Sequence, residues 1–224
     1  WEHNAVVRAL HALGAELDVV PGALFDSDAA LGGFRERLRG AECCVCTHVS
    51  NVFGFVLPVY EIAALCREYG VPFVLDASQS AGALPLDAAE LGADFIAMPG
   101  HKGLLGPQGT GVLLCSAQAR PLLFGGTGSE SRSRDMPAFL PDRLEAGTHN
   151  IPGIAGLMAG VNYVNRLGPA NIARRERALM RALALELKKL PGLEVFLSDG
   201  EEAQAGVLSV RHERAGSEEL GQAL

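Results

Sequence analysis

The sequence predicts an α/β domain with a mainly parallel central sheet, because short apolar runs alternate along the chain with amphipathic, helix-like runs. Each apolar run is bounded by turn residues, as is typical of strands that are buried on both faces of a parallel sheet. The clearest helix is predicted over residues 58–69, where apolar side chains recur at helical spacing until Gly70 and Pro72 end the pattern. We therefore expect strands at residues 17–20, 43–47, 73–76, 95–98 and 112–115.

The C-terminal half of the sequence predicts a change of architecture. Residues 125–141 are rich in Gly, Ser, Arg and Pro, which indicates a long surface loop of a length that is often functional. Two helices are expected next, at 151–166 and 169–190, followed by short strands at 193–197 and 206–210. We therefore expect a large domain over residues 1–167, a linking helix over 168–192 and the start of a small α+β domain over 193–224. Since the chain begins at Trp1 and stops within a helix-like run, we also expect a segment of a longer protein that lacks both ends.

Composition argues against several classes of function. There are 19 Lys and Arg against 26 Asp and Glu, a net charge of −7, which gives no reason to expect nucleic acid or an anionic membrane as a partner. No apolar run approaches the roughly 20 residues that span a bilayer. Three of the five cysteines crowd into residues 43–46, a spacing that suits neither a disulfide framework nor a zinc site. We expect buried, reduced cysteines in a cytoplasmic protein without a metal site.

The residues that could carry chemistry follow two of the predicted strands. Asp76 ends the strand at 73–76, and ligands of open α/β sheets bind beyond the carboxyl ends of strands. On its own, Asp76 could equally cap the next turn. After the strand at 95–98, Lys102 lies on a glycine-flanked turn, and lysine is the residue that forms Schiff bases with carbonyl cofactors. A phosphate-binding loop fits poorly, because this lysine precedes the glycine-rich stretch instead of following it.

Several motifs in one order resemble the class V aminotransferase family of pyridoxal-phosphate enzymes, and within it the cysteine desulfurase-like proteins. The resemblance covers about residues 1–190. Its motifs, in chain order, are Glu2-His3-Asn4, His48-Val-Ser-Asn51, Asp76-x-x-Gln79, Gly100-His101-Lys102, Gly106-Pro-x-Gly-x-Gly111 and Glu145-Ala-Gly-Thr148-His-Asn150. It implies the large domain of fold type I, with three layers and helices on both faces of the sheet.

The resemblance also implies roles for individual residues. Lys102 would hold pyridoxal 5'-phosphate as a Schiff base and move protons at the substrate α-carbon. Asp76 would pair with the pyridine nitrogen and keep it protonated, because a nearby negative charge favours the cationic form and the protonated ring is the better electron sink. His3 would stack on the cofactor ring.

Four further residues would complete the cofactor site by the same resemblance. Asn51 and Gln79 would form hydrogen bonds near the ring oxygen, and His101 would reach the phosphate. Thr148 would contact the phosphate held by a partner subunit, which implies a homodimer. One position departs from the family pattern, since Pro99 stands where many members have a phosphate-binding serine, so phosphate binding is expected to be altered.

The resemblance implies a cysteine desulfurase, which converts L-cysteine to L-alanine and passes the sulfur to an enzyme cysteine outside this segment and then to a possible acceptor protein. Transamination, selenocysteine lysis and epimerisation remain open, because they use the same scaffold. A binding or regulatory homologue without turnover is an alternative of another class. Retention of Lys102, Asp76, Gln79 and His101 together argues against it.

Overall fold

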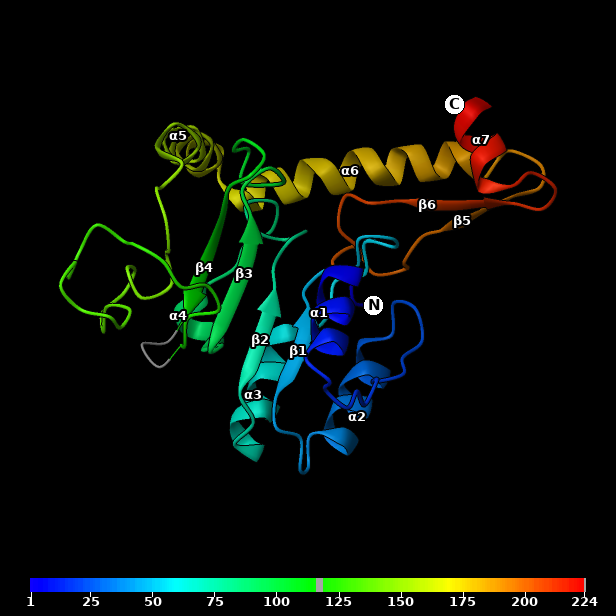
Figure 1. The fold of residues 1–224 in the computed structure, drawn as a ribbon. Coiled ribbons are helices and arrows are strands. Elements are labelled where there is room, and N and C mark those ends of the chain that lie inside the picture. The colour runs from blue at the N-terminus through cyan, green and yellow to red at the C-terminus, as the bar shows by residue number, and fades with distance from the viewer. Residues whose placement is uncertain (116–118, 224) are drawn as a thin grey trace.

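The computed structural model describes residues 1–115 and 119–223. Two helices precede the first strand, and two long helices lead from the main sheet to a smaller one (Figure 1). The elements are, in chain order, α1 (Asn4–Ala12), α2 (Ser27–Arg37), β1 (Cys44–Thr47), α3 (Val59–Tyr69), β2 (Phe73–Asp76), α4 (Ala88–Leu91), β3 (Phe95–Pro99), β4 (Gly111–Cys115), α5 (Ile151–Leu167), α6 (Pro169–Leu187), β5 (Leu193–Phe196), β6 (Ser209–His212) and α7 (Ser217–Ala223).

The main sheet has the strand order β1-β2-β3-β4 and is mainly parallel, as the sequence predicts. β1, β2 and β3 are parallel to one another, whereas β4 is antiparallel to β3. The direction of β4 follows from the short connection before it, residues 100–110, since a parallel crossover needs a dozen or more residues and usually a helix.

The two faces of this sheet are covered differently. One face carries Cys46, Leu75 and Ile96, which are in register on neighbouring strands and are buried in one core with side chains of α2 and α3. The opposite face carries Val45 and Val74, which are only half-buried. On that side α1 lies in front of β1, with the Glu2 carboxylate bound to the backbone N–H of Thr47 (Figure 1). Helices therefore flank both faces, as expected.

The helix α3 shows how local sequence sets these layers. It starts at Val59, directly after Pro58, and buries Val59, Ile62 and Cys66 on one side, at the spacing that the sequence predicts. It ends at Gly70, whose φ of 67° lies in the left-handed region that glycine adopts without a steric penalty.

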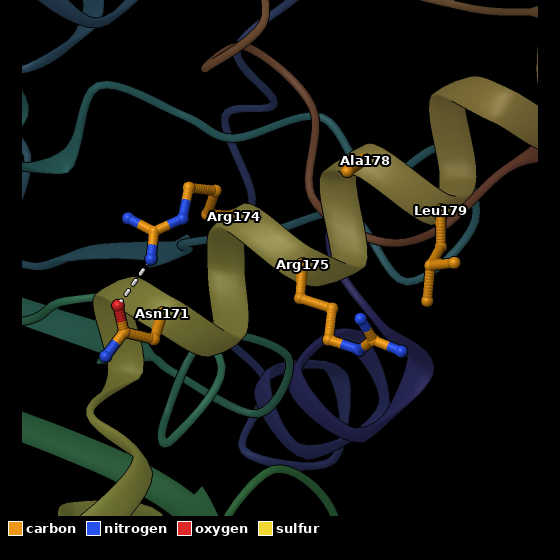
Figure 2. Close-up of a pocket in the computed structure, with 5 residues that line it drawn as sticks. All are labelled: Asn171, Arg174, Arg175, Ala178 and Leu179. Atoms are coloured by element: carbon orange, nitrogen blue, oxygen red, sulfur yellow. Dashed lines mark hydrogen bonds between the residues drawn. The ribbon is translucent and has the colours of Figure 1, made fainter.

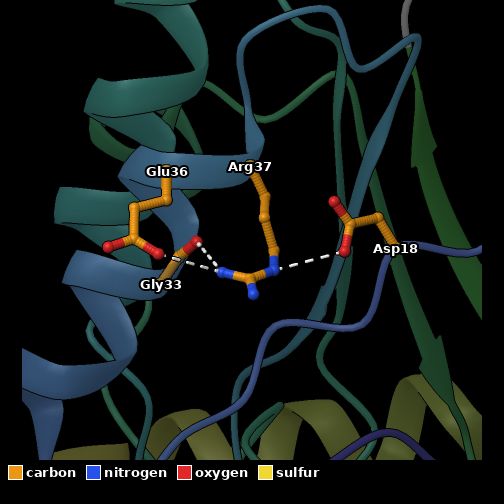
Figure 3. Close-up of polar contacts among 4 residues, drawn as sticks. All are labelled: Asp18, Gly33, Glu36 and Arg37. Carbon is orange, nitrogen blue, oxygen red and sulfur yellow. Dashed lines mark hydrogen bonds and ion pairs between the residues drawn. The ribbon is translucent and has the colours of Figure 1, made fainter.

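Residues 17–20 form no strand, and that prediction is wrong. Val19 is 74% exposed, and the segment has no regular secondary structure. It is held by α2 instead: Arg37 Nε lies 3.2 Å from Asp18 Oδ1, and Arg37 Nη1 also reaches the Gly33 carbonyl (Figure 3). A Cβ on Gly33 would lie 2.7 Å from Val20 Cγ1, so the glycine allows this close packing.

The C-terminal elements form a second, antiparallel sheet of β5 and β6 beside α6 (Figure 1). The strand predicted at 206–210 begins only at Ser209, because the residues before it contact the loop after β1. Arg177 of α6 binds the Gln204 carbonyl through Nε at 3.1 Å, and Arg181 binds the Ser198 carbonyl at 3.1 Å, which fixes this unit to the helix. Within the described residues, no helix is long and apolar enough to cross a membrane.

The cysteines follow the expectation of burial only in part. Cys44, Cys46 and Cys66 are buried, and burial raises the pKa of the Cys46 thiol. Cys43 is exposed and Cys115 is partly exposed, so the expectation is wrong for these two. Cys43 stands next to β1 rather than within it, so its side chain does not join the core.

Candidate active site

Three turns gather at the carboxyl edge of the parallel strands. The register pairs Thr47 of β1 with Asp76 of β2, and Asp76 with Ala97 of β3, so these strands end side by side. The turn after β1 carries Asn51, the turn after β2 carries Gln79, and the turn after β3 carries His101 and Lys102. Five of the seven residues predicted for the site thus lie at one edge of the sheet, on or beside adjacent strand ends.

The turns after β2 and β3 touch through their backbones. Gly82 has φ +80°, and a Cβ there would lie 2.2 Å from the Gly103 carbonyl oxygen. A Cβ on Gly103 would in turn lie 2.4 Å from the Ala81 carbonyl oxygen. Only glycine permits two segments of the backbone to approach so closely. This contact holds the turn of Gln79 directly against the turn of Lys102.

The Lys102 turn is closed by its own hydrogen bonds. Gly100 N–H donates to the Thr110 carbonyl at 2.8 Å, Gly106 N–H to the Gly100 carbonyl at 2.7 Å, and Leu105 N–H to the Lys102 carbonyl at 2.8 Å. Lys102 is half-buried and His101 is exposed. The turn therefore presents an amine on a rigid support.

Helix α5 supports that turn from outside. A Cβ on Gly160 would lie 2.4 Å from the Leu104 carbonyl oxygen, and one on Gly106 would lie 2.7 Å from Leu157 Cδ1. At the start of the helix, Asn150 caps the Gly153 N–H at 3.1 Å. Thr148 is exposed just before this cap. The long loop that carries Thr148 is thus joined to the Lys102 turn through α5.

Asp76 is buried, with 9% of its surface exposed, and its Oδ1 accepts a hydrogen bond from Ser78 N–H at 2.8 Å. The bond fixes the carboxylate at the strand end. The second carboxylate oxygen of Asp76 remains available as a hydrogen-bond acceptor.

Glu2 is a second carboxylate of this region, to which the sequence reasoning gave no role. Burial raises its pKa, the Thr47 N–H bond partly offsets that, and the negative charge of Asp76 raises the pKa further. Glu2 Oε2 is buried and makes no hydrogen bond within the described part of the chain. In the sequence, only its place beside His3 in a family motif pointed to Glu2. Its bond to Thr47 joins residues that are far apart in the chain, so no local pattern predicts it.

His3 has a structural role that the sequence did not predict. Its Nδ1 accepts the Ala5 N–H at 3.1 Å and so caps α1, and its ring is exposed. Stacking of this ring on a cofactor stays a prediction, as do the ring contacts of Asn51 and Gln79 and the phosphate contacts of His101 and Thr148.

A surface hollow on α6 contains none of these residues. Figure 2 shows that Asn171, Arg174, Arg175, Ala178 and Leu179 come from one helix, with Arg174 Nη2 bonded to Asn171 Oδ1 at 2.7 Å. Side chains of a single helix do not enclose a ligand on several sides, as ligand sites do. The sheet edge, rather than this hollow, is therefore the candidate site.

Comparison with known proteins shows the family of the chain. The family model described as "Aminotransferase class-V" matches residues 2–224. The chain belongs to this family. It is 38% identical over 156 residues to a protein named "Probable cysteine desulfurase" from Methanothermobacter thermautotrophicus, which covers 67% of this chain and 39% of that protein. A protein of the same name from Xylella fastidiosa is 38% identical over 185 residues, covering 80% and 44%.

Solved structures of class V aminotransferase relatives have the same fold. The apo cysteine desulfurase from Thermococcus onnurineus superimposes with a TM-score of 0.84 at 30% identity, covering 97% of this chain and 55% of that one. A cysteine desulfurase from Escherichia coli gives a TM-score of 0.81 at 25% identity, covering 95% and 53%. The chain spans about half the length of the relatives it matches.

Proposed function

We propose that the protein is a pyridoxal-phosphate-dependent enzyme that acts on an amino acid, with L-cysteine as substrate and L-alanine and transferred sulfur as products. One observation carries this proposal: the glycine contact between the turns after β2 and β3 holds Lys102 and Gln79 on touching segments, with Asp76 at the adjoining strand end. Relatives named cysteine desulfurase support the choice of substrate.

The donor set fits pyridoxal 5'-phosphate. An amine on a rigid turn suits a covalent bond to the cofactor aldehyde, and a buried carboxylate suits the protonated pyridine nitrogen. Asn51, Gln79, His101 and His3 supply polar groups and a ring around these two, and Thr148 supplies a hydroxyl for the phosphate of the neighbouring subunit. When bound, the cofactor supplies an electron sink for the charge that develops at the substrate α-carbon.

Residues of the chain supply proton transfer and charge stabilisation. The Lys102 amine accepts the α-proton of the substrate and later returns a proton. Asp76 holds its negative charge beside the ring nitrogen, where the surrounding protein excludes water and strengthens the interaction. Sulfur must leave L-cysteine for a reactive, accessible thiolate. Cys44, Cys46 and Cys66 are buried, and Cys43 before β1 and Cys115 at the end of β4 lie at the opposite edge of the sheet from Lys102, so we propose that the accepting cysteine lies outside this segment.

Three other reactions on the same scaffold stay open as alternatives: transamination, selenocysteine lysis and epimerisation. They would use the same lysine and aspartate, so the cofactor site does not separate them. An inactive binding homologue is the alternative of another class. Against it stands the pair Lys102 and Asp76, which a binding protein has no reason to keep at adjoining strand ends.

We further propose a homodimer with residues 1–167 as the cofactor domain, 168–192 as the linking helix and 193–224 as the start of a small domain, in the cytoplasm. The exposed apolar residues of the loop before α5 and of α5 itself support a dimer, because monomers seldom leave such groups in water. A sulfur-acceptor protein would be a further partner.

Borohydride reduction followed by peptide mapping tests the cofactor assignment. The sequence has three lysines, Lys102, Lys188 and Lys189. In the full-length protein the reduced cofactor should be found on Lys102, Lys102→Ala should abolish labelling, and Lys188→Ala should leave it unchanged. Label on Lys188 or Lys189 would contradict the proposal, and sulfide release from L-cysteine would separate desulfuration from the alternative reactions.

A further inference from the structure

Three consecutive carbonyl groups of the loop after β1 are bound by one short segment near the end of the chain. The Val52 carbonyl accepts from Ser209 Oγ, the Phe53 carbonyl from Gln204 Nε2 at 3.0 Å, and the Gly54 carbonyl from Ala205 N–H at 2.8 Å. These contacts cross about 150 positions of sequence. The conformation of this loop, with Asn51 at its start, is thus fixed by a distant part of the chain.

Gln204 is the centre of this contact. Its side chain is fully buried, and its Oε1 accepts the Ser198 N–H at 2.9 Å. Its Nε2 lies within 3.0 to 3.1 Å of the carbonyl oxygens of Phe53, Phe196 and Val207. One amide thereby joins the β1 loop to both ends of the segment between β5 and β6. A buried amide is favourable only when its polar groups are paired in this way.

Other residues of the loop after β1 also pack against the segment between β5 and β6. Gly54 has φ +68°, and a Cβ there would lie 2.7 Å from the Val207 carbonyl oxygen, so a side chain would force the segments apart. The Phe53 and Phe196 rings meet edge to face with centroids 5.2 Å apart. Within the loop, Ser50 N–H donates to the Phe55 carbonyl and Gly54 N–H to the Ser50 carbonyl, both at 2.9 Å. Movement of Phe53 or Gly54 would therefore move Asn51.

We propose that Gln204 is a positioning residue for the cofactor site, acting through the loop that carries Asn51. The inference rests on the proposed function, in which Asn51 contacts the cofactor ring. It assigns the segment between β5 and β6 a role in cofactor binding although its residues come from the opposite end of the chain. Loss of the Gln204 amide leaves the Phe53 carbonyl without its donor and frees Asn51 to adopt other orientations.

The first experiment needs no cofactor. Gln204→Met keeps the length of the side chain and removes its hydrogen bonds, and peptide-level amide hydrogen exchange is measured on the full-length apoprotein. Exchange in residues 50–56 should become roughly tenfold faster, equivalent to about 1.4 kcal/mol of local opening. Gln222→Met, an exposed glutamine of α7, is the matched control and should leave this peptide unchanged. Unchanged exchange in Gln204→Met would overturn the proposal.

The second experiment is a double-mutant cycle on the dissociation constant of pyridoxal phosphate. Gln204→Met should weaken binding about tenfold in the otherwise wild-type protein and less than about twofold in an Asn51→Ala background, because the residue acts through Asn51. Equal effects in both backgrounds would show a general structural role and overturn the proposal, as would an Asn51→Ala protein with unchanged affinity. Phe34→Leu, a core change in α2, controls for lost stability and should leave affinity unchanged.

Ser209→Ala is the second variant if Gln204→Met does not fold. It removes only the bond to the Val52 carbonyl, so hydrogen exchange and cofactor affinity should change in the same direction as in Gln204→Met but by less. Ser209→Thr keeps the hydroxyl and should restore wild-type exchange and affinity. If neither hydrogen exchange nor affinity responds to Ser209→Ala, the proposal is wrong. Failure of the proposed function itself would appear separately, as borohydride labelling that does not depend on Lys102.

Discussion

Asp76 and Asp94 are carboxylates at opposite edges of the same sheet, and each accepts one backbone N–H. Asp76 accepts the Ser78 N–H at 2.8 Å, and Asp94 accepts the Phe73 N–H at 2.8 Å. Asp76 ends β2 at the edge that carries the Lys102 turn, whereas Asp94 directly precedes β3 at the other edge. Position, rather than residue type, thus separates a candidate catalytic group from a structural one.

Replacement of Asp76 by Asn should leave the fold intact and slow turnover. Asn keeps the oxygen that binds Ser78 N–H but removes the charge that, in the proposed function, holds the ring nitrogen protonated. A loss of two pKa units at that nitrogen corresponds to about 2.7 kcal/mol, or roughly a hundredfold in rate. Steady-state kinetics of the full-length Asp76→Asn protein should show this fall in kcat, with Asp94→Asn at the wild-type rate. Equal kcat in both variants would remove Asp76 from the mechanism.

His48 makes stability depend on pH. It lies just after β1 and is buried, and its Nδ1 makes no hydrogen bond to any residue that the structure describes. Burial lowers its pKa to about 4. Between pH 6.5 and 4 the unfolded chain therefore binds a proton that the folded protein does not, so acidification favours unfolding.

The free energy of unfolding should fall as the pH is lowered from about 6.5 to about 4, by up to roughly 3 kcal/mol from this residue, and the contribution should be constant above and below that window. Urea unfolding at a series of pH values measures it. His48→Gln should flatten the curve in this window. His11→Gln, which removes an exposed histidine of α1, should keep the wild-type curve. A wild-type slope in His48→Gln would assign the acid sensitivity to other groups.

Helices and strands whose bounds depend on the local sequence pattern lie where the sequence predicts them. Segments whose structure depends on contacts with distant residues do not. β2 has the predicted bounds and α3 begins one residue inside them, because a buried run or an apolar stripe defines each. Residues 17–20 have the same apolar character but are bound by Arg37 of α2, a contact that sequence does not reveal. The site divides in the same way: Lys102 and Asp76 follow from strand ends and motifs, whereas Glu2 and Gln204 emerge only from the fold.

The contact between the turns after β2 and β3 can be tested with one methyl group. Gly82→Ala places a Cβ 2.2 Å from the Gly103 carbonyl oxygen at a positive φ, and overpacking together with backbone strain should destabilise the protein by roughly 2–4 kcal/mol. Gly40→Ala has a similar φ of +86° with nothing within 4 Å, so only the backbone cost of the left-handed conformation, roughly 1–2 kcal/mol, should remain. Urea unfolding compares the two.

Gly82→Ala should also weaken cofactor binding, because relief of the clash moves the Gln79 turn away from Lys102. Gly40→Ala should bind the cofactor like the wild-type protein. If the two glycine variants were equally stable and bound cofactor equally well, the contact would have no part in forming the site.

Seen as a whole molecule, the protein leaves several large apolar side chains exposed in the loop before α5 and on α5 itself. Leu122, Leu123 and Phe124 are exposed in the loop before α5, with Phe124 at 76%, and Ile151 and Met158 are exposed on α5. Along the chain, Thr148 lies between the exposed loop residues and α5. An association of two subunits that covered these apolar side chains would therefore also bring Thr148 to the neighbouring subunit.

The proposed dimer should therefore weaken when a charged residue replaces one of these apolar residues. In a two-fold interface each substitution occurs twice, so loss of about 2 kcal/mol of burial per Phe124 side chain removes about 4 kcal/mol, or nearly a thousandfold in the dimer dissociation constant. Sedimentation velocity of full-length Phe124→Asp should show monomer at micromolar concentration, with cofactor affinity reduced as well, because the partner's Thr148 is lost. Leu190→Asp, an exposed apolar residue after α6, should remain dimeric. A Phe124→Asp protein that stays dimeric would exclude this loop from the interface, and a wild-type protein that is monomeric and fully active would refute the shared site.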